Sequence, residues 1–266
     1  MNFPDKIDAE RLVRLQREVG SRLSVFFREI TESTNSDAVS LIASGAAKED
    51  FVCISNIQTA GRGRVAGRRW ESTPGNIFLS CGFLPQGLRP ERLANLTLWF
   101  GVALAKMLRE KFDIPVAVKW PNDIWCSGKK MAGMLAEAHA NSGSIRGIVF
   151  GVGLNVNTIP QGTESFATSL MRESGEKTLD VNRVCADVLL ALENAYANFL
   201  AGTHGEKLSR IWKDFDLLDG QRITGIFADE RIEGTACGID SVGNLCIQTD
   251  SGAIRKFSAG DISLLK

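Results

Sequence analysis

Apolar and polar positions recur along this chain with two different periods, so the sequence predicts both helices and strands. Helical spacing predicts helices over residues 8–19, 90–112, 181–200 and 206–215, and a further helix from the Ser33-Thr34-Asn35 corner to Ser44. Short β-rich runs predict strands over residues 22–30, 51–57, 76–84, 116–119, 124–126, 129–137 and 145–154. Residues 158–180 are polar and aperiodic, and we expect irregular structure there.

The pattern changes after Leu218, where short strands separated by turn residues replace the long helices. The runs at 221–227, 232–240, 244–249, 253–257 and 261–265 predict a small antiparallel barrel appended to an α/β body. Glycines at 147, 151 and 153 interrupt the strand at 145–154, which indicates that a helix or a ligand approaches its backbone closely.

Composition narrows the class of protein. The chain has 31 Lys+Arg against 31 Asp+Glu, so the charge total predicts no general affinity for nucleic acid or anionic membranes. The N-terminus lacks a signal-peptide core, and the most apolar window, 93–108, is too short for a membrane span and favours a buried helix. Six cysteines without a CxxC pair mostly lie in apolar runs, typical of reduced core thiols in a cytoplasmic protein.

Histidine chemistry is scarce in this sequence. Only His139 and His204 occur, which excludes a His-rich metal site or paired-histidine catalysis. His139 lies in an expected strand, and we expect it to have a structural role.

Positive charge is concentrated in one stretch, Gln58 to Trp70, where arginines alternate with glycines. Such a run cannot bury an apolar face, so it predicts a mobile loop whose backbone N–H groups and guanidinium groups suit phosphate or carboxylate. Taken alone, the run is equally typical of a solvated surface loop or a nucleic-acid patch.

Further polar residues stand at strand ends or in the loops beside them. They are Ser33, Thr34, Asn35, Gln58, Lys119, Asn122, Asp123, Lys130 and Asn155. Several cations and glycines with one carboxylate fit an anionic phosphate ligand with Mg²⁺. The sequence has neither a Walker A motif nor a Gly-x-Gly-x-x-Gly that opens a helix, so the usual nucleotide folds are not indicated.

Four of these segments together resemble the signature motifs of the biotin protein ligase family, in the family's order and spacing. They are Gly61-Arg-Gly-Arg64, Lys119-Trp-Pro-Asn-Asp-Ile124, Lys130-Met-Ala-Gly133 and Gly151-Val-Gly-Leu-Asn-Val156, and Glu32-Ser-Thr-Asn35 and Gln58 match as well. The resemblance covers roughly residues 22 to 265. Each motif alone is better explained by turns and packing, but their joint occurrence reverses that interpretation.

The resemblance implies an α+β fold in two domains. Residues 1–215 would form the biotin/lipoate ligase catalytic domain, a class II synthetase-like mixed β-sheet with flanking helices, and residues 216–266 an SH3-like barrel. It also implies a biotin–[biotin carboxyl-carrier protein] ligase. Such an enzyme activates biotin with Mg-ATP as biotinyl-5′-AMP and then transfers it to a lysine of a carrier domain, as in acetyl-CoA carboxylase.

Site residues follow from the same resemblance, position by position. It implies Lys130, Arg62 and Arg64 as catalytic residues. Biotin would contact Ser33, Thr34, Asn35, Gln58, Gly61, Arg62, Gly63, Arg64 and Lys130. ATP and the adenylate would contact Arg62, Arg64, Arg68, Trp70, Lys119, Asn122, Asp123, Lys130 and Asn155, with Asp123 a candidate for Mg²⁺.

The sequence also departs from the family pattern. Val65-Ala66 stand where one residue is usual, which displaces Arg68 and Trp70 by one position. Only about twenty residues precede the first strand, so we expect no winged DNA-binding domain and no repressor role. A lipoate–protein ligase and a nucleic-acid-binding module remain the alternatives, and the sequence is compatible with a homodimer without determining the oligomeric state.

Overall fold

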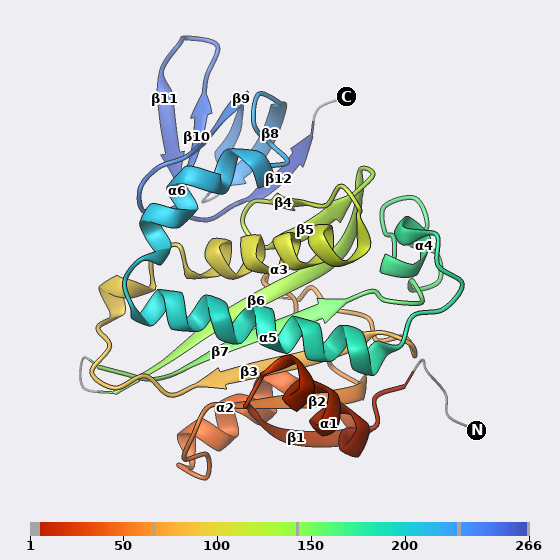
Figure 1. Ribbon diagram of the computed structural model, residues 1–266. Helices are drawn as coiled ribbons and strands as arrows, with labels where there is room; N and C mark the ends of the chain where they lie inside the picture. The colour runs from red at the N-terminus through yellow and green to blue at the C-terminus, as the bar shows by residue number, and fades with distance from the viewer. Residues whose placement is uncertain (1–5, 66, 142–143, 228–229, 265–266) are drawn as a thin grey trace.

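A seven-stranded mixed sheet forms the centre of this computed structural model, which describes residues 6–65, 67–141, 144–227 and 230–264 (Figure 1). The strand order is β1-β2-β3-β7-β6-β5-β4. Strands β1 and β2 pair in parallel, and the other neighbours pair antiparallel. The strands are β1 (Ser24–Thr31), β2 (Phe51–Gln58), β3 (Ile77–Phe83), β4 (Ala117–Lys119), β5 (Asp123–Cys126), β6 (Lys129–Asn141) and β7 (Ser144–Leu154).

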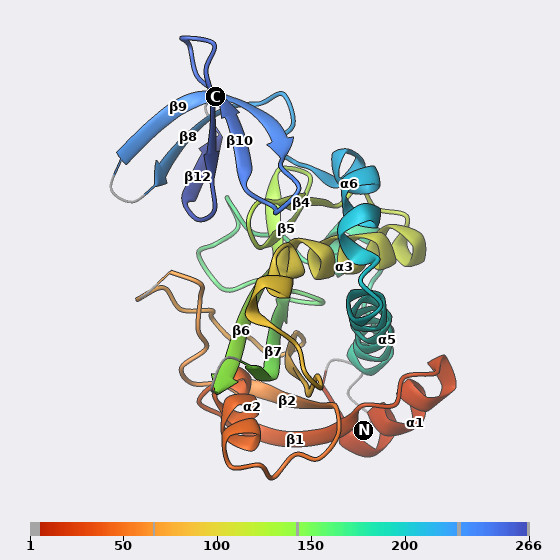
Figure 2. The same ribbon diagram turned by 90° about the vertical axis from the view of Figure 1, so that its left-hand side faces the viewer.

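Helices cover the two faces of this sheet unequally. The long helices α3 (Leu96–Phe112) and α5 (Val181–Leu200) lie on one face, and α1 (Ala9–Val19) packs beside α5 (Figures 1 and 2). The short helix α2 (Thr34–Ala43) packs against β2, β3 and β7 on the other face. The second face is therefore left partly open, and the loop that follows β2 lies on that side (Figure 2).

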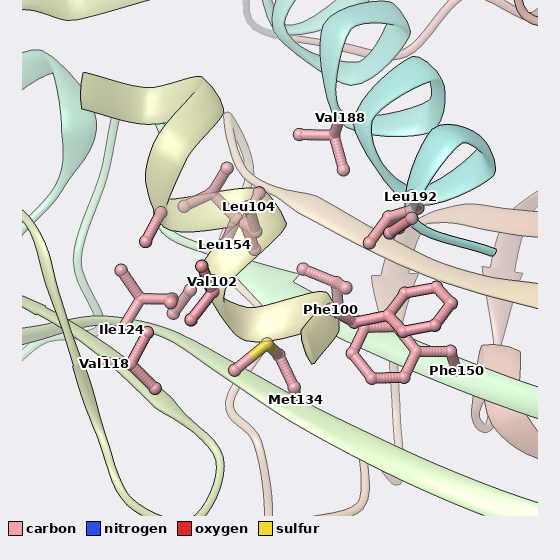
Figure 3. Packing of buried hydrophobic residues seen from close by; sticks show 14 of the residues in the cluster. Phe100, Val102, Leu104, Val118, Ile124, Met134, Phe150, Leu154, Val188 and Leu192 are labelled. Carbon is pink, nitrogen blue, oxygen red and sulfur yellow. The ribbon is translucent and has the colours of Figure 1, made fainter. Parts of the chain in front are cut away.

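The alternation of residues along the strands explains this asymmetry. On β7, Phe150 and Leu154 point into the core beneath α3 and α5, where the ring of Phe150 lies 4.5 Å from that of Phe100 (Figure 3). Burying each such aromatic side chain contributes roughly 1.5–3 kcal/mol. The alternate positions of β7 face the other way and include Gly151 and Gly153, which leave the second face without bulk.

The glycines of β7 lie where other side chains contact the strand, as the sequence predicted. A Cβ at position 147 would lie 2.7 Å from Ile42 of α2, one at position 151 would lie 2.0 Å from Asn35, and one at position 153 would lie 2.4 Å from Trp70. Glycine is therefore required on this face by close packing.

A second, five-stranded antiparallel sheet forms the C-terminal part, with the order β11-β10-β9-β8-β12 (Figure 1). Its strands are β8 (Arg222–Phe227), β9 (Glu230–Ile239), β10 (Leu245–Gln248), β11 (Ile254–Phe257) and β12 (Asp261–Leu264), and α6 (His204–Phe215) precedes it. Side chains of the larger part contact this C-terminal part. Asn95 donates to Ser241 O, and Trp120 Nε1 donates to Gly243 O. The predicted two-part α+β fold is confirmed.

Three details of the sequence prediction are wrong. The segment 90–112 is not one helix, because Asn95 adopts φ 65° and separates a 3₁₀ turn (Pro90–Leu93) from α3. The segment 158–180 contains a short helix, α4 (Leu170–Ser174), capped by the Ser169 hydroxyl. Cys237 is exposed on β9, whereas the other five cysteines are buried.

Among the described residues, no helix is both long and apolar enough to cross a bilayer. Ala66, part of the departure from the family spacing, lies outside the described residues.

Candidate active site

A cleft opens on the face of the sheet that bears Gly151 and Gly153. It lies between the start of α2 and the Gly/Arg loop, which runs from Thr59 to Trp70. Residues from six segments line it: Ser33, Thr34, Asn35, Gln58, Arg62, Gly63, Arg64, Trp70, Leu79, Asn122, Lys130, Gly133, Met134, Leu135, Gly151, Val152 and Gly153. Most residues that the sequence assigned to a biotin site therefore lie together.

The first turn of α2 forms one end of the cleft. Ser33 occupies the N-cap position, but its side chain makes no capping hydrogen bond. The side chain of Gln58 replaces that cap, because its Oε1 accepts from Thr34 N at 2.9 Å. The Ser33 hydroxyl is therefore not used to cap the helix and is left for other partners.

A chain of buried polar groups continues from this end across the sheet. Thr34 Oγ1 lies 2.8 Å from Ser80 Oγ, and Ser80 Oγ donates to Asn35 Oδ1 at 2.6 Å. Asn35 Nδ2 donates to Glu137 Oε2 at 2.7 Å, and Arg62 Nη2 donates to the same oxygen at 2.5 Å. This chain connects the floor of the cleft to the Gly/Arg loop.

The Gly/Arg loop has more internal structure than the sequence suggested. Gly63 N donates to Arg68 O, and Trp70 N donates to Gly61 O, so the described part of the loop folds back on itself as a narrow hairpin. The amides of Gly63 and Trp70 are therefore engaged within the loop. Gly61 stands at the base of this hairpin and does not line the cleft.

Two arginines of this loop reach the C-terminal sheet. Arg64 donates to Asn122 Oδ1 at 3.3 Å and to Gly260 O at 2.6 Å. Arg68 forms an ion pair with Asp261 on β12 and does not line the cleft. The structure thus connects the C-terminal part directly to the loop beside the cleft.

Lys130 lies at the opposite end of the cleft from α2. Its Nζ is 2.8 Å from Asp123 Oδ1 and 5.4 Å from the centre of the Trp70 ring. The backbone of Lys130 pairs with the 166–168 segment, since its N–H donates to Phe166 O and its carbonyl accepts from Thr168 N. The side chain of Lys130 is therefore held between a carboxylate and an aromatic face.

Trp70 separates the cleft from a second hollow. This hollow has a volume of about 260 Å³ and is lined by Arg69, Trp70, Glu71, Lys130, Asn155, Pro160, Thr163, Phe166 and Ala167. Asn155 is anchored here, because its Nδ2 donates to Thr168 O while its Oδ1 is buried without a partner. Lys130 and Trp70 line both spaces.

Lys119 and Asp123 are close to the cleft but do not line it. The Lys119 ammonium lies 4.6 Å from the centre of the Trp125 ring, and burial lowers the pKa of this lysine. Asn122 has a clear structural role, because its Nδ2 donates to Met134 O and its carbonyl accepts from Met134 N. These contacts join the strand-ending turn to β6.

The sequence analysis missed several residues of the site, and Ser80 and Glu137 are the two that join the chain of hydrogen bonds described above. Ser80 is a fully buried hydroxyl inside an apolar strand, which is the signal that could have identified it. Glu137 gave a weaker signal, because its partners become apparent only once α2 packs on the sheet.

Comparisons with known proteins identify the family of this chain. Residues 27–155 match the biotin/lipoate A/B protein ligase family, and residues 220–265 match the biotin protein ligase C-terminal domain. The second match favours biotin over the lipoate alternative.

Individual relatives match over most of the chain. The bifunctional ligase/repressor BirA of Bacillus subtilis is 33% identical over 245 residues, which span 90% of this chain and 74% of that protein. The biotin–[acetyl-CoA-carboxylase] ligase of Mycobacterium tuberculosis is 34% identical over 250 residues, 89% of this chain and 87% of that protein.

A solved structure supports the same relationship. The biotin protein ligase of Aquifex aeolicus in complex with biotin and ATP has a TM-score of 0.75 and 27% identity, covering 91% of this chain and 99% of that one. The chain therefore belongs to the biotin protein ligase family.

Proposed function

We propose that the cleft and the second hollow together carry out both steps of an ATP-dependent biotin protein ligase, with Lys130 at their junction. The enzyme forms biotinyl-5′-AMP from biotin and ATP and transfers the biotinyl group to a carrier protein. The observation that carries the residue assignment is that Lys130 and Trp70 line both spaces. A group bound in the cleft and one bound in the hollow would meet beside the Lys130 ammonium.

The α2 end of the cleft suits the ring system of biotin. A ureido group has N–H donors and a carbonyl acceptor, and when buried these must be hydrogen-bonded. Ser33, Thr34, Asn35 and Gln58 provide hydroxyl and amide partners there, and Gly151 allows the Asn35 side chain to lie close to the sheet. The carboxylate of the ligand would then extend towards Lys130.

The second hollow suits the nucleotide. Trp70 and Phe166 provide aromatic faces on which a base can stack, and Phe166 is 55% exposed. Arg69 lies on the same wall, where it can contact phosphate oxygens. Asn155, with its unpartnered Oδ1, can accept a hydrogen bond from the adenylate.

In the first step the biotin carboxylate attacks the α-phosphorus of ATP, and pyrophosphate leaves. The barrier includes the repulsion between a carboxylate and a polyanion, which fixed cations reduce. Lys130 is already held in place by Asp123 and Trp70, so its ammonium needs little reorganisation. Arg64 extends from the loop on the same side, and we assign it to the phosphates.

In the second step an uncharged lysine amine of the carrier attacks the carbonyl carbon of the mixed anhydride. AMP leaves with the electrons of the cleaved C–O bond, and the amine proton passes to solvent. The same cations that stabilise the first step then stabilise the departing AMP. The proposed carrier is the biotin carboxyl carrier domain of acetyl-CoA carboxylase or of a related carboxylase.

Magnesium enters this scheme as part of the MgATP substrate. Asp123 was the sequence candidate for a metal ligand, but its carboxylate faces the Lys130 ammonium at 2.8 Å. In the ranges that the structure describes, His, Cys, Asp and Glu side chains form no cluster of three or more suited to a metal ion. We therefore assign Asp123 to the orientation of Lys130.

The test is the transfer of labelled biotin to a purified carrier domain. We expect ATP-dependent labelling of one carrier lysine and no labelling when lipoate replaces biotin. A protein that transfers lipoate and not biotin, or that labels the carrier without ATP, would refute this function.

A further inference from the structure

We propose that Glu137 is a positioning residue. It determines which polar atoms at the biotin-binding end of the cleft donate hydrogen bonds and which accept them. The inference rests on the proposed function and adds a residue outside the family motifs of this sequence. Glu137 lies on β6, on the face that bears the cleft, and its Oε2 accepts from both Asn35 Nδ2 and Arg62 Nη2.

The ionised carboxylate of Glu137 determines how the Asn35 amide is oriented. A carboxylate only accepts hydrogen bonds, so the NH₂ group of Asn35 must face Glu137 and its Oδ1 must face Ser80. Without Glu137, the amide could rotate by 180° and present its donor to Ser80 instead. Glu137 thus distinguishes two amide orientations of nearly the same shape.

The orientation of Asn35 is transmitted through two hydroxyl groups. Ser80 has one proton and donates it to Asn35 Oδ1. The contact between Ser80 and Thr34, 2.8 Å long, must then use the Thr34 proton. Thr34 cannot donate to Gln58 Oε1 at the same time, although that oxygen lies only 3.1 Å away.

The result is a pair of neighbouring acceptor atoms at the floor of the cleft. Thr34 Oγ1 and Gln58 Oε1 both present lone pairs, which suits a ligand that donates N–H groups from a ring. A ureido ring provides such donors, whereas the dithiolane ring of lipoate has none. Glu137 is therefore a determinant of specificity that acts through Asn35, Ser80 and Thr34.

Arg62 completes the arrangement. The Glu137 side chain is 32% exposed and that of Arg62 41% exposed, so the pair lies at the edge of the cleft. Arg62 neutralises the carboxylate there, which prevents an unpaired negative charge from repelling an anionic ligand. The same ion pair ties the Gly/Arg loop to the sheet.

The competing explanation is an ordinary surface ion pair without influence on the ligand. To separate the two, biotin affinity is measured by calorimetry for wild type, Glu137→Ala, Glu137→Gln, Asn35→Ala and the double variant Asn35→Ala/Glu137→Ala. Glu110→Ala is the matched control, because Glu110 pairs with Lys106 on the exposed side of α3. Biotin-dependent exchange of pyrophosphate into ATP gives KM and kcat for the same proteins.

We expect Glu137→Ala to weaken biotin binding about tenfold, to raise KM for biotin by a similar factor, and to change kcat less. Glu137→Gln should lose less biotin affinity, because its amide oxygen can still accept a hydrogen bond from Asn35. The double variant should bind biotin no more weakly than Asn35→Ala alone, since both changes interrupt the same series of hydrogen bonds. The Glu110→Ala control should match wild type.

Two results would overturn the inference: an affinity within twofold of wild type for Glu137→Ala, or full additivity with Asn35→Ala. If Glu137→Ala does not fold, the same comparison is made with the near-isosteric Glu137→Gln. A biotin affinity equal to that of wild type would then refute the inference. The proposed function is judged separately, on wild type alone, because it fails only if wild type does not bind biotin or does not catalyse the exchange.

Discussion

Replacing Lys130 by alanine removes a cation that lines both the cleft and the second hollow. Its ammonium is preorganised, because Asp123 lies 2.8 Å away and the side chain is only 31% exposed. Removing one preorganised donor from a developing oxyanion costs roughly 3–4 kcal/mol, which corresponds to about a hundred- to a thousandfold in rate. We expect Lys130→Ala to slow adenylation by that factor.

The effect of this change on folding should be much smaller. The backbone of Lys130 carries the contacts to Phe166 and Thr168, and alanine keeps them. The loss is one partly exposed ion pair, about 1 kcal/mol, with some further cost because Asp123 is left 21% exposed and unpaired. The variant Lys130→Ala/Asp123→Asn removes that unpaired charge and should recover stability without recovering activity.

The assay is the release of pyrophosphate from biotin and ATP, measured beside a thermal melt of each variant. Lys129→Ala is the control, since Lys129 is the adjacent residue of the same strand, donates to Glu164 O, and does not line the cleft. Turnover near wild type for Lys130→Ala would refute the reasoning. Equal losses of turnover for Lys129→Ala and Lys130→Ala would instead attribute the effect to a disturbed turn between β5 and β6, which both residues follow.

Three further predictions follow from named contacts. Gly151→Ala places a Cβ 2.0 Å from Asn35 Oδ1 and should weaken biotin binding about tenfold by calorimetry, and unchanged affinity would contradict that packing. Burial raises the pKa of Asp216 from 3.8 to about 6, so the folded state loses stability as pH rises between these values. Between pH 4 and pH 7 the free energy of unfolding of Asp216→Asn should therefore rise by roughly 2–3 kcal/mol relative to that of wild type. A difference in stability between the two proteins that does not change with pH would refute this. Biotin with ATP should protect the loop between Gly61 and Gly67 from proteolysis, and equal cleavage with and without ligand would count against ligand-induced ordering.

Much of the site could be predicted because its residues sit where a local pattern ends. Lys130 follows the Ser127-Gly128 turn, where both residues have positive φ, and Asn122 follows a strand that proline cannot continue. Strand ends are visible in a single sequence. The glycines of β7 were equally informative, since glycine at alternate positions of an apolar strand shows where other side chains lie close to its backbone.

The parts that could not be predicted depend on contacts between distant segments. Glu137 acquires its role from Asn35, 102 residues away, once α2 lies across β7. Arg68 matched the family motif, yet in the structure it pairs with Asp261, 193 residues away. No local pattern contains the docking of the C-terminal sheet, so this ion pair could not be predicted from the sequence. The assignment of Arg68 to the adenylate rested on the family resemblance and stays a prediction.

The same long-range contacts explain why a neutral chain gathers so much positive charge in one loop. Arg62 pairs with Glu137 and Arg68 pairs with Asp261, so carboxylates from β6 and β12 neutralise two of the loop's four arginines once the chain is folded. Both pairs are partly exposed, and such pairs are typically worth only about 0–1 kcal/mol. A hydrogen bond from arginine to a charged ligand group is worth roughly 1.5–3 kcal/mol, so an anionic ligand that reaches Arg68 can displace Asp261 at little cost. Arg68 can therefore exchange a protein carboxylate for a ligand anion, while Arg62 stays paired with Glu137.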